Sequence, residues 1–261
     1  MPNLTDWIDL STSLGGLQSG LQDTHRWSAF DDKLRSEELF SQLSQQRNIV
    51  TSLQGVINRR LQTVSQHGIE MGEVCDFFIH LFGQESARGN INWDVELFRQ
   101  AVRTHDFGEV IHAKVGSDVP ASEKTDQDDK DEYDEYCRYL ARTYPGDEAF
   151  VKKMRRVFLL QFCLNDNPLL PQDIIADLKT HCRTEALMFQ AIENWGYFLY
   201  ALDQRITFRN IKIMRRVIKN HTSDYERLAE ELPGFAEIIW TPEMQNYCTD
   251  FQQRYGEGAA S

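Results

Sequence analysis

Apolar residues recur at spacings of three and four along most of the chain, which is the period of an amphipathic α-helix. The first such pattern covers Trp7 to Leu21, and a longer one follows from Ser36 to Ile57. Later patterns predict helices over 171–181, 185–203, 208–220, 223–232 and 242–254. Strand-like alternation is convincing nowhere, although EVIHAKV (109–115) is compatible with extended backbone. The sequence therefore predicts an all-α fold.

Two helices are predicted in the middle of the chain, before the polar residues His105 and Asp106. Met71, Val74, Phe78 and Leu81 would form a buried face of a helix that ends at Gly83. Asn92 is expected to cap the next helix, WDVELFRQAVRTH, with His105 and Asp106 at its C-terminal end. Residues 116–133 are poor in apolar side chains and rich in aspartate, which predicts a solvated loop leading into another helix. Pro145-Gly146 predicts a break after that helix.

Composition narrows the class of protein. The chain has 261 residues, of which 41% are hydrophobic, and 15 of them are phenylalanine, so one packed core with appended helices is expected. The net charge is −12 and the basic residues form no uncompensated stripe, which argues against a nucleic-acid polymer as partner. A small nucleotide stays compatible, because neutralising one or two phosphates needs only a metal ion and an arginine or two.

Cysteine usage and hydropathy predict a location in the cell. The cysteines are odd in number, scattered and without a C-x-x-C pair: Cys75, Cys137, Cys163, Cys182 and Cys248. This pattern argues against a disulfide framework or a cysteine zinc cluster and fits a reducing compartment. The first residues lack the basic and apolar regions of a signal peptide, and no run of about 18 apolar residues occurs. We expect a cytoplasmic protein with no membrane partner, and a homodimer stays open.

Four polar residues stand out because they lie on otherwise apolar helices or at their ends: His67, His105, Asp106 and Glu193. Each one alone is most often a cap or a surface residue. Together, two imidazoles and two carboxylates form a mixed N/O ligand set that suits Mn²⁺, Fe²⁺, Co²⁺ or Zn²⁺ and leaves positions for water and a phosphate oxygen. Such a site requires ligands from separate rigid helices to converge on one point.

Two motifs resemble those of the HD-domain metal-dependent phosphohydrolases, most closely the 5′-deoxynucleotidase branch. The segment RLQTVSQH (60–67) is similar to the family pattern R-x-E-x-V-[AS]-[EQ]-H, and HDFGEV (105–110) is similar to H-D-x-x-E-[VI]. The resemblance spans roughly residues 45–205. It implies an HD-domain-like helical bundle over 46–205, with an N-terminal helical extension (1–45) and a C-terminal helical extension (206–261).

The resemblance also implies roles for individual residues. His67, His105 and Asp106 would be metal ligands, and Glu109 would be the catalytic carboxylate that orients or deprotonates the attacking water. A second catalytic aspartate follows in a G-D-x-P segment of the family, which GSDVP (116–120) matches at Asp118 after a local insertion.

The remaining roles fit the family pattern less closely. Its last metal ligand is an aspartate on a late helix, where this chain places Glu193, with Asp203 as a less well-aligned substitute. The extra methylene of glutamate displaces the carboxylate unless the helix moves. Arg60 is the expected phosphate contact, because a bidentate guanidinium suits the dianion. An arginine-tryptophan pair expected upstream in the deoxynucleotidases is not evident, which leaves the exact substrate open.

The leading hypothesis is therefore a phosphohydrolase that uses a divalent metal ion (Mn, Co, Fe, Zn or Mg) and releases phosphate from (deoxy)nucleoside monophosphates. One alternative is a degenerate HD domain that acts as a binding or regulatory module, motivated by Glu193 and the terminal helices. Another is a di-iron HD oxygenase, for which His80 and His112 are available as further ligands. The R-x₄-H spacing of Arg216 and His221, similar to that of HEPN-type ribonucleases, is attributable to chance because arginine is frequent in this chain.

Overall fold

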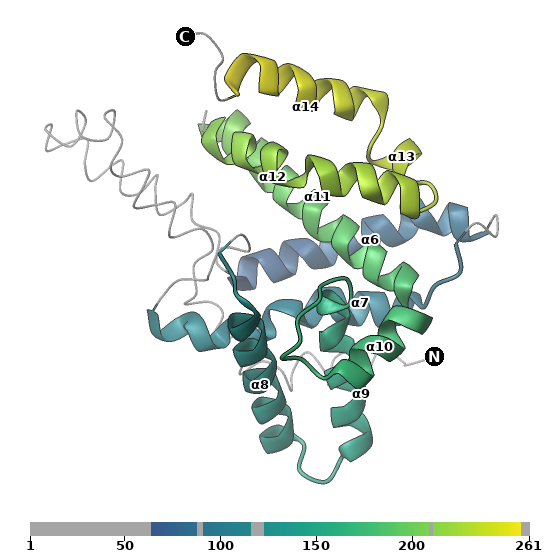
Figure 1. Cartoon of the computed structure of the whole chain (residues 1–261), viewed down its shortest axis with the longest axis vertical. Coiled ribbons are helices and arrows are strands. Elements are labelled where there is room, and N and C mark those ends of the chain that lie inside the picture. Colours follow the sequence, from purple (N-terminus) through teal and green to yellow (C-terminus); the bar gives the residue numbers. More distant parts are fainter. Residues whose placement is uncertain (1–63, 88–90, 116–122, 209–210, 257–261) are drawn as a thin grey trace, which may run out of the picture. The chain divides into compact units, whose positions relative to one another are not determined.

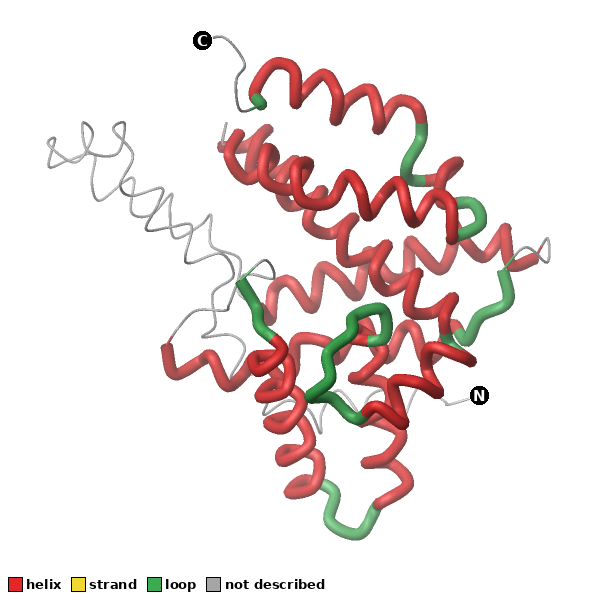
Figure 2. Tube along the Cα trace, viewed as in Figure 1, coloured by secondary structure: helices red, strands yellow, loops and turns green. Residues whose placement is uncertain are grey.

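The computed structural model describes residues 64–87, 91–115, 123–208 and 211–256. Every regular element in these ranges is a helix, which confirms the predicted all-α fold (Figure 2). None of these helices is long and apolar enough to cross a membrane. The helices expected at 7–21 and 36–57, and the expected boundary at residue 45, lie outside the described residues. The chain divides into two compact units, each made of several chain segments.

The first unit contains the start of α6 (Val64–Ala87), the 3₁₀ helix η1 (His105–Val115), α8 (Asp126–Thr143) and α9 (Glu148–Leu159). In this unit α8 packs against both η1 and α9, and a tight turn joins α8 to α9 (Figure 1). The turn contains the predicted Pro145-Gly146 break, and Gly146 takes a φ of 92°, a left-handed conformation that favours glycine.

Aromatic side chains hold α8 and α9 together. Tyr136 is fully buried on α8, and its ring stacks on Phe158 of α9 with 4.5 Å between the ring centroids. One turn earlier, Tyr133 lies 6.3 Å from the same phenylalanine and accepts a hydrogen bond of 2.8 Å from Arg155 Nε. This face of α8 therefore points into the core, although the sequence around it is strongly acidic.

The second unit contains the rest of α6, most of α7 (Val95–Thr104) and of α10 (Gln172–His181), and the whole of η2 (Leu160–Phe162), α11 (Arg183–Phe208), α12 (Ile211–Glu231), α13 (Phe235–Ile238) and α14 (Pro242–Tyr255). Here α12 packs along α11 and contacts α13 and α14 (Figure 1). Tyr225 is the centre of this packing. Its ring stacks on Trp240 at 5.1 Å and faces Phe235 at 6.1 Å, while its hydroxyl donates to the Asn194 carbonyl on α11 at 2.6 Å.

Two helices are longer than expected. The separate helices predicted over 208–220 and 223–232 are one continuous helix, α12, because no glycine or proline interrupts it. The Thr222 hydroxyl, in the expected gap, donates back to the Ile218 carbonyl at 2.6 Å within the helix. The predicted helix 185–203 runs from Arg183 to Phe208 as α11, so the expected core boundary at residue 205 falls inside a helix.

The expected ends of α6 and α7 are also wrong. The first continues through Gly83 to Ala87, because a helical glycine costs only about 1 kcal/mol and no turn residue follows it directly. At the start of α7, Asp94 rather than Asn92 provides the cap: its Oδ1 accepts hydrogen bonds from the backbone N–H groups of Glu96 (2.9 Å) and Leu97 (3.0 Å).

The described residues 105–115 and 123–133 are more helical than expected. The stretch EVIHAKV belongs to η1 and is not extended. α8 begins inside the predicted solvated loop, because a capping box forms at Thr125: its hydroxyl accepts from the Asp128 N–H at 3.3 Å, and the Asp128 carboxylate accepts from the Thr125 N–H at 2.8 Å.

Removing the Tyr225 ring should destabilise the second unit strongly. We expect Tyr225→Ala to lower the free energy of unfolding by about 3–5 kcal/mol, since it removes two aromatic contacts and leaves a cavity. Tyr225→Phe should cost about 1 kcal/mol through the lost hydrogen bond. Urea unfolding followed by circular dichroism measures both. Tyr255→Phe on α14 is the matched control, with an expected change within about 0.5 kcal/mol; equal effects of the two Phe variants would contradict the prediction.

Candidate metal centre

Three of the expected metal ligands converge in the first unit. One ligand atom from each of His67, His105 and Asp106 lies within 4.8 Å of the other two. His67 Nε2 is 3.9 Å from Asp106 Oδ2, and His105 Nε2 is 2.9 Å from Asp106 Oδ1. The two imidazole rings are 5.7 Å apart and nearly perpendicular. All three residues are buried, so the cluster is screened from bulk water.

The chain reaches this arrangement from two elements. His67 lies in the first turn of α6, whereas His105 and Asp106 begin η1 directly after α7 ends at Thr104. The position of His105 and Asp106 at a helix end is thus as expected. Because a 3₁₀ helix has three residues per turn, Glu109 lies on the same face of η1 as Asp106.

A close backbone approach fixes η1 against α8. A Cβ atom on Gly108 would lie only 2.5 Å from the Glu132 carbonyl oxygen and 2.7 Å from its Cβ. Neither atom can move without moving α8, so glycine is required at this position. The contact brings the neighbouring Glu109 to the part of α8 that carries Glu132.

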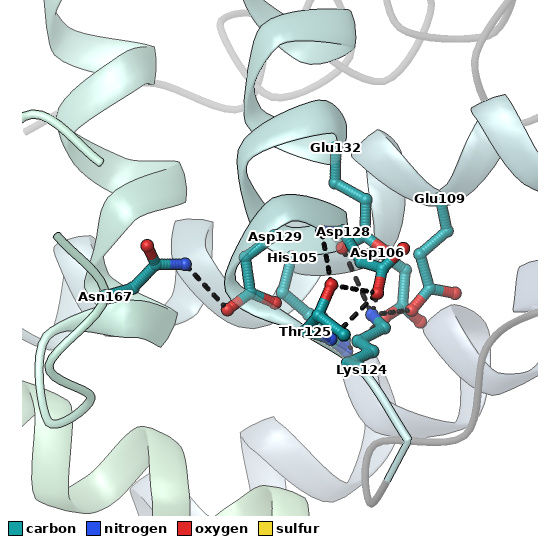
Figure 3. Close-up of polar contacts among 9 residues, drawn as sticks. All are labelled: His105, Asp106, Glu109, Lys124, Thr125, Asp128, Asp129, Glu132 and Asn167. Carbon is teal, nitrogen blue, oxygen red and sulfur yellow. Dashed lines mark hydrogen bonds and ion pairs between the residues drawn. The ribbon is translucent and has the colours of Figure 1, made fainter. Parts of the chain in front are cut away.

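Lys124 lies between two buried carboxylates, as Figure 3 shows. Its Nζ donates to Glu109 Oε1 at 2.8 Å and contacts the Glu132 carboxylate at 2.9 Å (Oε1) and 3.1 Å (Oε2). The Glu132 side chain is 1% exposed and that of Glu109 is 9% exposed, so both charges are largely removed from water. Burying a carboxylate without a partner is costly, and the ammonium offsets that cost for both residues.

Further contacts hold the start of α8 next to this ion-pair group. The capping box of Thr125 and Asp128 follows Lys124 directly (Figure 3). One turn later, Asp129 accepts a hydrogen bond of 3.2 Å from Asn167 Nδ2, which also donates to the Asp126 carbonyl at 2.9 Å. Burial raises the pKa of Asp129, and the hydrogen bond from Asn167 partly offsets this.

The donor atoms fit a divalent transition metal. Two imidazole nitrogens with one carboxylate are ligands that Mn²⁺, Fe²⁺, Co²⁺ and Zn²⁺ accept, and three protein ligands leave coordination positions for water or substrate. The three donors come from rigid helical elements, as a stable site requires.

The other expected site residues are not placed with this cluster. Arg60 and Asp118 lie outside the described residues. Glu193 is half-buried on α11 and belongs to the second unit, so its role as the last ligand stays a prediction. The side chain of Asp203, the alternative on the same helix, is not described.

The residues behind the alternative hypotheses have ordinary surroundings where they are described. His80 is exposed on α6 in the second unit, and the side chain of His112 is not described. His221 stacks on Tyr197 at 5.3 Å and lies 3.4 Å from Asp224, which is the packing of a structural histidine.

Sequence reasoning missed Gly108, Lys124 and Glu132. A signal for the start of α8 existed, because Thr125 and Asp128 have the spacing of a capping box. Once α8 is placed, Glu132 falls beside Tyr133 and four residues before Tyr136, on the buried face. No local sequence pattern marks Lys124, because its partners are distant in sequence: Glu109 lies on η1 and Glu132 lies about two turns into α8.

Comparisons with protein-family models, with curated proteins and with solved structures give no match.

Metal binding should depend on the clustered side chains. We expect the purified protein to bind Mn²⁺ or Co²⁺, and His67→Ala, His105→Ala and Asp106→Ala each to weaken binding at least about 10-fold, because each removes one of few ligands. Isothermal titration calorimetry and elemental analysis measure this. His181→Ala, an exposed histidine on α10, is the control and should bind like the wild type. Unchanged affinity in all three site variants would rule out this metal centre.

Substitution of Gly108 should destabilise the first unit. Gly108→Ala places a methyl group against the Glu132 backbone, and we expect a loss of about 1–3 kcal/mol in the free energy of unfolding. Gly72→Ala on α6 is the matched control: its Cβ would meet nothing within 4 Å, and replacing a helical glycine should stabilise by about 0.5–1 kcal/mol. Thermal unfolding of the two variants should therefore shift in opposite directions; a shift in the same direction would contradict the close approach.

Proposed function

We propose that this chain is a metal-dependent phosphohydrolase that acts on nucleotides, with (deoxy)nucleoside monophosphates as the expected substrate class. The observation that carries the proposal is the buried convergence of His67, His105 and Asp106, with Glu109 on the same face of η1 as Asp106. These are the residues at which the sequence resembles the HD-domain phosphohydrolases. The proposal rests on the donor chemistry and that resemblance together.

Each residue has a chemical task in this proposal. His67, His105 and Asp106 would hold a divalent ion, which supplies charge neutralisation for a phosphate group and makes a nearby water more acidic. The Glu109 carboxylate orients the attacking water and accepts its proton. Asp118, if it acts as the family pattern implies, is a second carboxylate at the reaction, and Arg60 contacts the phosphate dianion.

Burial of the site suits this chemistry. The carboxylates and imidazoles lie where bulk water is largely excluded, so their interaction with a phosphate and with developing charge is stronger than it would be on the surface. An acidic chain of net charge −12 offers no broad attraction to a polyanion, which favours a small substrate that is neutralised locally.

Phosphate release tests the proposal. The metal-loaded protein should release orthophosphate from at least one member of a panel of nucleoside and deoxynucleoside monophosphates in Mn²⁺, Co²⁺ or Mg²⁺. Glu109→Gln should reduce kcat by about 100-fold or more at unchanged metal affinity, because the amide cannot accept the proton. Glu226→Gln, an exposed glutamate on α12, is the control with wild-type rates expected.

A binding or regulatory module is the second candidate, and one observation favours it. His105 Nε2 and Asp106 Oδ1 lie 2.9 Å apart, close enough to pair with each other directly without a metal ion. A protein that binds metal but releases no phosphate across the panel would support this candidate, and a Glu109-dependent rate would exclude it.

A further inference from the structure

We infer that Lys124 is a positioning residue: together with Glu132 it fixes the Glu109 carboxylate beside the His67, His105 and Asp106 cluster. The inference rests on the proposed function for its consequence in catalysis, but the ion-pair group itself is a property of the fold. No motif in the sequence assigns a role to either Lys124 or Glu132.

The contact distances show how Lys124 binds the two carboxylates. Lys124 Nζ donates to one oxygen of Glu109 (2.8 Å) and contacts both oxygens of Glu132 (2.9 and 3.1 Å), so Glu132 is the two-point anchor and Glu109 the one-point partner. The contact involves Oε1 of Glu109, and Figure 3 shows Oε2 on the side away from the ammonium. The ammonium thus restrains the Glu109 carboxylate through one of its oxygens.

The charges explain why this needs a lysine. Glu109 and Glu132 are both buried, and two neighbouring carboxylates in a low-dielectric environment repel each other. An ammonium between them converts the repulsion into two ion pairs. Without it, Glu109 would lower its energy by turning toward solvent or by taking up a proton, and both changes remove a correctly placed base.

Lys124 is itself held by its surroundings. It directly precedes Thr125, whose capping box fixes the backbone where α8 begins. The close approach of Gly108 to the Glu132 backbone then sets the spacing between η1 and α8 that the lysine spans. The position of the ammonium therefore follows from the backbone on both sides, which is the arrangement expected of groups that orient a reactive side chain.

The kinetic test uses Lys124→Met, which keeps the length of the side chain and removes its charge. We expect kcat for phosphate release to fall by about 10- to 100-fold, because a base displaced by about 1 Å is a poor base, while KM and Mn²⁺ affinity stay within about 2-fold of wild type. Lys124→Arg should recover part of the rate, since a guanidinium can reach both carboxylates. Lys130→Met, which removes an ion pair with Asp134 on the solvent side of the same helix, is the matched control with wild-type kcat.

A double-mutant cycle tests the ion-pair group without any activity. The melting temperatures of Lys124→Met, Glu109→Gln and the double variant should be non-additive by at least about 2 °C, because the second change removes a partner already lost. Lys124→Met combined with Glu226→Gln should be additive. If Lys124→Met does not fold, Lys124→Gln replaces it in both experiments.

Each result bears on a distinct claim. Additive melting temperatures, or a Lys124→Met protein with wild-type kcat, would overturn the inference while the phosphohydrolase proposal stands. If the wild-type protein releases no phosphate from any nucleotide, the proposed function fails, and the cycle alone decides whether Lys124 holds Glu109. Non-additivity with a selective loss of kcat and partial recovery in Lys124→Arg supports the inference.

Discussion

The first unit depends on the absence of one side chain, at Gly108. The backbone of η1 approaches α8 so closely that a single methyl group would collide with the Glu132 carbonyl. Because η1 also carries His105, Asp106 and Glu109, this one contact sets the distance of these three side chains from α8. Lys124 can contact both Glu109 and Glu132 only at that distance. The ion-pair group therefore depends on the close backbone packing of η1 against α8.

The cluster places several charged groups in the protein interior, where removing them from water costs free energy. Asp106, Glu109 and Glu132 are buried carboxylates, and their partners are two imidazoles and one ammonium. A hydrophobic core of the same volume would stabilise the fold at least as well. Proteins retain such groups mainly where the groups have a task, which is why this region is a better candidate for function than the aromatic core around Tyr225.

Sequence periodicity was sufficient for the all-α fold class, because helix periodicity is a local pattern. The expectation that His67 lies near His105 and Asp106 came from the motif resemblance and not from periodicity. Periodicity failed where a residue's environment comes from distant segments. The acidic residues before Tyr133 were predicted as a solvated loop because the helix cap at Thr125 was not recognised. The helix α12 was predicted as two helices, although the Thr222 hydroxyl donates to the Ile218 carbonyl within one continuous helix. Lys124 could not be found at all, since its partners lie on η1 and two turns along α8.

The capping box at Thr125 has a consequence for the dynamics of the site. Helix ends are where local opening begins, and the first two turns of α8, from Thr125 to Glu132, directly follow Lys124 and carry its second partner, Glu132. Fraying of these two turns would release the lysine and its carboxylate anchor in one step, while the imidazoles of α6 and η1 need not move. A ligand that binds only the closed form would suppress this opening in proportion to its concentration, so occupancy of the site and order at the start of α8 are thermodynamically linked.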